Sequence, residues 1–167
     1  GAASLWWLHY SLEKLSGALS EIGGTLVLRH GNTAQSLREF AGETKAQAIF
    51  WNRSHEPAER RREAEVAAEM AEIGVEVSRH STDLLYEPGS VRTKTGGQYS
   101  VFTPFYRACM AGPPPAEPLT APERLRLPET LPRSDRLADW QLLPVRPDWA
   151  GGLRDAWVPG EAGARQT

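Results

Sequence analysis

A short apolar stretch that ends in polar residues and a proline constrains the fold of this chain more than any other feature. The residues from Ala46 to Trp51 are mostly apolar and suit one short buried strand. Pro57 then fits the first turn of a helix, where its missing N–H costs no hydrogen bond, and the helical pattern continues to Ile73 before Gly74. A strand that leads directly into a helix is the repeating unit of parallel α/β folds, in which ligands bind where the strands end.

The same alternation occurs on both sides of this stretch. Thr25 to Leu28 is short, apolar and bounded by glycines, which predicts another buried strand. Val75 to Val77 predicts a third strand, nearer a sheet edge because a charge separates the valines. The segment from Leu5 to Ile22 predicts a helix, because its apolar residues recur at steps of three and four: Leu5, Leu8, Leu12, Leu15, Leu19 and Ile22. We therefore expect an α/β fold with a partial Rossmann-like parallel sheet and flanking helices.

Two shorter helices are predicted from their first residues. Asn32, with Gln35 three residues later, forms a capping-box pattern and predicts a helix that ends near Gly42. Thr103 as the N-cap, followed by Pro104, predicts a helix over residues 105–110. On the helix that begins at Pro57, Glu59 and Arg62 are spaced for an ion pair. The core positions of that helix are expected to be Val66, Met70 and Ile73.

The composition changes sharply after Gly112. Ten of the thirteen prolines lie from Pro113 onward, which is typical of a linker and not of a second core. We expect residues 1–112 to form the α/β domain and residues 113–167 to be a proline-rich interdomain linker. The linker contains Trp140, Trp149 and Trp157, and side chains of this size favour packing against a partner domain.

The charge and the cysteine content exclude several classes of protein. A net charge of -2 argues against tight, non-specific binding of nucleic acid by the chain as a whole. Cys109 is the single cysteine, so no intramolecular disulfide can form and a reducing compartment is the simpler assumption. The longest apolar runs are only a few residues, which predicts neither a signal peptide nor a membrane span. We expect a cytoplasmic protein that does not contact a membrane.

Candidate site residues follow the strand that ends at Trp51. Polar groups are supplied there by Asn52, Arg53, Ser54, His55 and Glu56, and Glu59 follows in the first turn of the helix. This set suits an aromatic or heterocyclic ligand, but capping of the helix explains the same residue types. The four histidines have no ligand spacing, so no metal site is expected. No glycine motif for a dinucleotide or a P-loop is present.

Several segments together resemble the N-terminal α/β domain of the DNA photolyase and cryptochrome family, in particular the bacterial deoxyribodipyrimidine photolyases. The most specific are Tyr99 to Phe105 (YSVFTPF) and Phe50 to Glu59 (FWNRSHEPAE). The resemblance covers nearly the whole chain in order, and the other matching stretches are 1–12, Gly31 onward, 87–106, 147–157 and 159–164.

The resemblance implies an accessory role for this part of the family's sequence. In photolyases a C-terminal helical domain holds FAD, which repairs a pyrimidine dimer in DNA by light-driven electron transfer. The N-terminal domain holds an antenna chromophore, a deazaflavin or methenyltetrahydrofolate. By resemblance, the deazaflavin-binding positions correspond to Ser54 and Glu56, and the folate-binding positions to Ala58 and Glu59. Ser54 and Ala58 depart from the family's acidic and amide residues, so the identity of the chromophore stays open.

The resemblance also implies that the chain is truncated at both ends. The family's first two strands and its FAD domain have no counterpart here, and no catalytic residue of the carbon–carbon lyase reaction can be assigned. We expect part of a light-dependent DNA repair enzyme that is inactive alone and binds no DNA specifically by itself. Two other interpretations are a stand-alone small-molecule-binding or interaction module on a photolyase-like domain, and a gene fragment without function.

Overall fold

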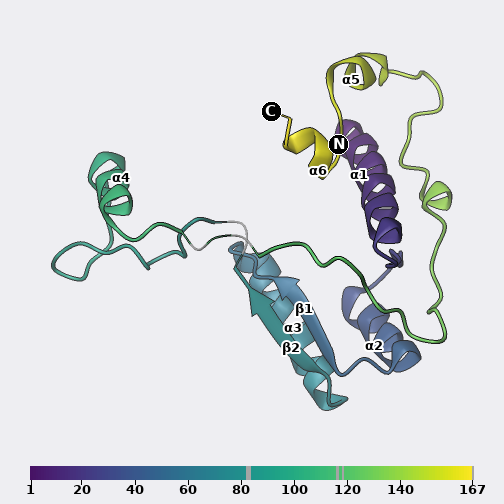
Figure 1. Cartoon of the computed structure of the whole chain (residues 1–167), viewed down its shortest axis with the longest axis horizontal. Coiled ribbons are helices and arrows are strands. Elements are labelled where there is room, and N and C mark those ends of the chain that lie inside the picture. The colour runs from purple at the N-terminus through teal and green to yellow at the C-terminus, as the bar shows by residue number, and fades with distance from the viewer. Residues whose placement is uncertain (82–83, 116, 118, 167) are drawn as a thin grey trace. The chain divides into compact units, whose positions relative to one another are not determined.

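The structure is a computed structural model that describes residues 1–81, 84–115, 117 and 119–166. It contains two compact units, which are described separately: Gly1–Lys45 with Ala121–Thr167, and Ala46–Thr120. Figure 1 shows the helices and strands with their labels. No helix formed by the described residues is long and apolar enough to cross a membrane.

The second unit contains the sheet. Strands β1 (Ala48–Asn52) and β2 (Glu76–His80) run parallel and pair in register from Ala48 opposite Glu76 to Asn52 opposite His80. Helix α3 (Pro57–Glu72) connects them and lies against one face of the pair (Figure 1). The predicted strand–helix–strand passage is therefore confirmed, including the proline in the first turn of α3.

The core of this unit lies between α3 and the strands. Val66 and Met70 are buried, as their helical spacing predicts, and Val75 is buried just before β2. Ile73 was predicted as a third core position, but it lies beyond the end of α3 and is 38% exposed. Strand β1 was expected to be buried, yet Phe50 is 66% exposed. Because α3 covers one face of the pair, a side chain on the other face remains in solvent.

Helix α4 (Phe102–Ala111) belongs to the same unit and begins earlier than expected. Val101 occupies the N-cap position in an extended conformation, and no side chain caps the helix. Thr103 was predicted as the N-cap, but it lies inside the first turn. Pro104 fits in the first turn of this helix because the backbone N–H that proline lacks would have no partner within the helix at that position.

The first unit consists mainly of helices. Helix α1 (Ala2–Glu21) spans the predicted helix, but Leu5, Leu8 and Leu15 of the predicted apolar stripe are exposed. The buried side chain is instead Trp6, which is 1% exposed and lies against Tyr10, with ring centroids 4.9 Å apart. Helix α2 (Thr33–Thr44) begins as predicted, because Asn32 Oδ1 accepts a hydrogen bond from the Gln35 backbone N–H at 3.0 Å. It continues past Gly42 and ends at Lys45, whose φ is 53°.

The segment from Thr25 to Leu28 does not form the predicted strand. Among the described residues, β1 and β2 pair only with each other, so this segment has no strand beside it. Its backbone instead bonds to a later loop: the Leu28 N–H donates to Ser134 Oγ at 2.9 Å, and the Leu28 carbonyl accepts from the Asp135 N–H at 2.7 Å. A strand needs a neighbouring strand whose backbone completes its hydrogen bonds, and an apolar sequence pattern alone does not provide that neighbour.

The proline-rich segment from Ala121 onward belongs to the same unit as α1 and α2. It contains a 3-10 helix (Leu137–Trp140) and the short helices α5 (Gly151–Ala156) and α6 (Glu161–Ala164). Trp157 packs edge-on against Trp7, with ring centroids 6.0 Å apart, and Ala150 is completely buried. Two of the three tryptophans of this segment therefore contact aromatic or imidazole rings of the N-terminal segment, Trp157 at Trp7 and Trp140 at His30. Its role as an interdomain linker stays a prediction.

Candidate functional site

The candidate site lies in the turn between β1 and α3. Ser54, Glu56 and Glu59 are close in sequence, and the fold holds them at the end of a parallel strand, where α/β proteins bind ligands. Ser54 Oγ accepts a hydrogen bond from the Glu56 backbone N–H at 3.2 Å. The serine therefore stabilises the turn that leads into the helix.

The two glutamates differ in their surroundings. Glu56 occupies the N-cap position of α3, but its side chain makes no capping hydrogen bond, and the residue is exposed. Glu59 forms the predicted pair with Arg62, whose Nη1 donates to both carboxylate oxygens at 2.8 and 3.0 Å. Capping by the side chain therefore does not explain Glu56, while the first-turn carboxylate of Glu59 is engaged with its own helix.

Glu63 is a structural member of this turn that sequence reasoning did not identify. Its Oε1 accepts a hydrogen bond from the Ser54 backbone N–H at 2.7 Å, so the second turn of α3 holds the loop. Glu63 follows Glu59 by four residues and shares its helix face, which is the one signal in the sequence that indicates this role.

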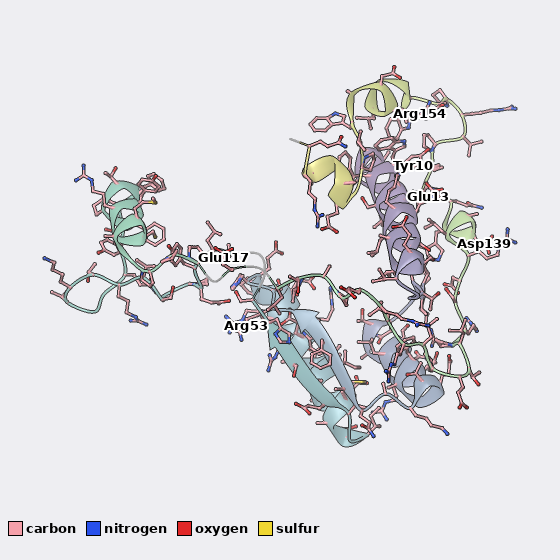
Figure 2. All side chains as sticks on the ribbon, in the orientation of Figure 1. Tyr10, Glu13, Arg53, Glu117, Asp139 and Arg154 are labelled. Carbon is pink, nitrogen blue, oxygen red and sulfur yellow. The ribbon has the colours of Figure 1, made fainter. Side chains whose placement is uncertain are left out.

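An open hollow of about 510 Å³ adjoins this turn. Its lining comes from the loop after β1, from α3 and from β2: Arg53, Arg60, Arg61, Glu63, Ala64 and Arg79. Figure 2 labels Arg53 near the end of the two strands. Ser54, Glu56 and Glu59 do not line this hollow, so the predicted residues and the cluster of four arginines are neighbours in the fold and not one site.

The fit of a heterocyclic chromophore depends on free polar groups. Glu56 offers an exposed carboxylate that can accept from a ring N–H or hydroxyl group. Three residues before Ser54, the indole nitrogen of Trp51 is buried and has no hydrogen-bond partner among the described residues. Buried polar atoms normally have a partner, so this atom is a second free group close in sequence to the turn. The residues present are thus compatible with such a ligand.

The described part of the chain holds no group of three His, Cys, Asp or Glu side chains that could bind a metal ion. Cys109 is half-buried in α4, and its carbonyl, not its thiol, accepts a hydrogen bond from the Tyr86 hydroxyl at 3.2 Å. The catalytic apparatus of the family was not expected here, and no residue is assigned to it.

Comparison with known proteins agrees with the resemblance that the sequence motifs indicate. The family model for DNA photolyase matches residues 1–123. A deoxyribodipyrimidine photo-lyase of Agrobacterium fabrum is 41% identical over 98% of this chain and 34% of its own length. Cryptochrome-1 of Arabidopsis thaliana is 31% identical over 75% of this chain and 19% of its own length.

A solved structure matches the whole fold. The crystal structure of a bacterial class III photolyase from Agrobacterium tumefaciens superposes with a TM-score of 0.94 and 40% sequence identity, covering 99% of this chain and 34% of that one. The chain thus spans about a third of the length of these two bacterial photolyases. The match extends over both units of the fold and over the turn that follows β1, so the chain belongs to the DNA photolyase family.

Proposed function

We propose that this chain contributes the antenna-chromophore part of a light-dependent DNA repair enzyme, a cyclobutane pyrimidine dimer photolyase, and is not catalytic alone. The observation that carries the proposal is the match over 98% of this chain to only 34% of a deoxyribodipyrimidine photo-lyase. In such an enzyme the remaining two thirds would supply the FAD domain and the contact with damaged DNA.

The proposed chromophore site is the turn formed by Ser54, Glu56 and Glu59. A bound deazaflavin or methenyltetrahydrofolate would absorb near-ultraviolet or blue light and pass the energy to the flavin. The exposed Glu56 carboxylate and the Ser54 hydroxyl would hold a deazaflavin. Glu59 would hold a folate after exchanging part of its pairing with Arg62. Glu56 needs no such exchange, which favours the deazaflavin.

Titration of the purified chain with each chromophore tests this proposal. Absorption and fluorescence would be followed for the chain and for Glu56→Gln, Glu59→Gln and the control Glu65→Gln, an exposed position on the same helix. Loss of a charge-assisted hydrogen bond weakens binding by roughly tenfold or more. We expect Glu56→Gln to weaken the deazaflavin by this factor, Glu59→Gln to weaken the folate, and Glu65→Gln to change neither. If the chain binds neither chromophore, the antenna proposal is wrong.

The coding sequence on either side of this chain provides a test that needs no protein. An in-frame, methionine-started strand upstream and a helical flavin domain downstream would support a photolyase. Stop codons close to both ends would contradict it.

A further inference from the structure

We infer that the arginine hollow, lined by Arg53, Arg60, Arg61, Arg79 and Glu63, binds the phosphate group of a small phosphate ester or diphosphate. This inference goes beyond the proposed function, because none of the three candidate residues for the chromophore lines the hollow: Ser54, Glu56 and Glu59.

The charge of the lining favours an anion. Four of its six residues are arginines, which remain protonated at any physiological pH. The one acid, Glu63, already accepts the Ser54 backbone N–H at 2.7 Å. Arg53 has a nearby acid in Glu87, but the separation is 3.7 Å and both side chains are partly exposed, so the pair is weak. The hollow therefore keeps an excess of positive charge.

The position of the hollow in the fold adds to this charge. Arg60 and Arg61 lie within two turns of the N-terminus of α3, a helix of sixteen residues whose dipole places positive charge at that end. Arg53 follows β1, and Arg79 is the penultimate residue of β2. Arginines from three successive elements thus converge where both parallel strands end, a place at which α/β proteins hold phosphates.

Arginine suits this ligand for a geometric reason. Its planar guanidinium presents parallel N–H donors that match two oxygens of one phosphate, and several such groups share the charge of a diphosphate. The side chains of Arg60, Arg61 and Arg79 are exposed, so an anion that binds them displaces only water and does not disturb the core.

The size of the hollow and its surroundings favour a small ligand over a nucleic-acid strand. A volume of about 510 Å³ lies within the usual range of small-molecule pockets, about 300–1,000 Å³. Glu56, Glu59 and Glu65 flank the run of arginines in the sequence. The net charge of the chain is -2, whereas proteins that follow a phosphate backbone normally carry a basic surface. A diphosphate fits within the hollow, but a longer polyanion would approach these acids.

Calorimetric titration of the full chain with inorganic pyrophosphate tests the inference. The variants are Arg61→Gln and Arg79→Gln, both on exposed positions, and the control is Arg107→Gln on α4, which changes the net charge equally. We expect each hollow variant to weaken pyrophosphate binding about tenfold and the control to leave it unchanged. Far-ultraviolet circular dichroism of each variant checks that α3 and the strands persist.

Three outcomes would overturn the inference. One is the absence of pyrophosphate binding to the parent chain. Another is equal weakening in Arg107→Gln, which would mean a general effect of net charge. The third is tighter binding of a single-stranded oligonucleotide than of pyrophosphate, lost in the same variants, which would mean a nucleic-acid surface. Glu56→Gln separates this inference from the chromophore proposal, because it should weaken the deazaflavin and leave pyrophosphate bound at least as tightly.

Discussion

Few side chains of this chain are buried, so each buried residue contributes a large share of the packing. The fully enclosed large side chains among the described residues are Trp6 and Met70, one in each unit. Helical spacing in the sequence identified Met70 and Val66 correctly and failed at Ile73. Helical spacing assigns Ile73 to the buried face of α3 only if the helix continues to that residue. The helix ends at Glu72, and Gly74 then turns the backbone with a φ of 74°.

The two methionines of the chain form a matched pair for testing this packing. Met70 is fully buried and Met110 is 69% exposed. Met70→Ala should lower the free energy of unfolding by about 2–5 kcal/mol, since it removes buried methylene groups and leaves a cavity. Met110→Ala should change it by less than about 0.5 kcal/mol. Urea unfolding followed by circular dichroism measures both, and equal effects would contradict the assigned core.

The residues of the candidate site were only partly predictable. A rule about strand ends, which depends only on local sequence, selects the polar residues that follow β1, and the family resemblance narrows them to Ser54, Glu56 and Glu59. The role of Glu63 depends on how the loop after β1 folds against α3, and the convergence of Arg53 with Arg79 depends on how β2 returns beside β1. The sequence alone does not show whether Arg60 and Arg61 line a hollow or lie on a solvated face of the helix.

At the scale of elements, an ion pair joins three segments of the first unit. Arg29 donates to the carboxylate of Glu43 on α2, and the same carboxylate accepts the Arg133 backbone N–H at 3.1 Å. The hydrogen bond from Arg29, and to a smaller degree that from Arg133, lowers the pKa of Glu43 below its ordinary value of 4.5. The segment around Leu28 and Arg29, where a strand was predicted, is therefore attached by polar contacts and not by a sheet.

This pair predicts a specific pH dependence. A carboxyl whose pKa is lower in the folded state stabilises the fold above the unfolded value and loses this contribution as the pH falls through the folded value. The midpoint of urea unfolding should therefore decrease below about pH 4.5, and Glu43→Gln should reduce the size of that decrease. Arg29→Gln should have the same effect, with little further change in the double variant. Identical pH profiles for the parent and Glu43→Gln would contradict the assignment.

The element types were predictable from the sequence because caps and periodicity are local signals. The Asn32 cap, the Pro57 start of α3 and the β1–α3–β2 passage all follow from a few adjacent residues. The segment over residues 25–28 failed for the opposite reason. Its pattern is that of a strand, but pairing requires a second segment that the pattern does not contain.

At the scale of the whole molecule, the chain exposes much apolar surface. Among the described residues only six apolar side chains are buried, while Leu5, Trp7, Leu8, Leu15 and Phe50 are among many large ones that are exposed. Within the part of the chain that the structure describes, strands β1 and β2 each pair on one side only. Unpaired strand edges and contiguous apolar patches both promote association.

We therefore expect the isolated chain to be marginally stable or to aggregate. Size-exclusion chromatography with light scattering should detect oligomers that grow with protein concentration, and heating should produce a broad transition. A chain that stays monomeric and unfolds in one cooperative step at high protein concentration would contradict this expectation; the urea measurements above are made on dilute protein. The same preparation, supplied with damaged DNA and light, should show no repair.

The hydrogen bond from the Ser54 backbone to Glu63 has one further consequence. It holds the loop against α3, so the conformation of the four residues between β1 and the helix is restricted before any ligand binds. Ordering a free residue costs about 1–2 kcal/mol in conformational entropy, and a ligand that meets an ordered loop avoids most of this loss. A ligand held there by few contacts would thus lose less conformational entropy on binding, because the fold has already ordered the loop.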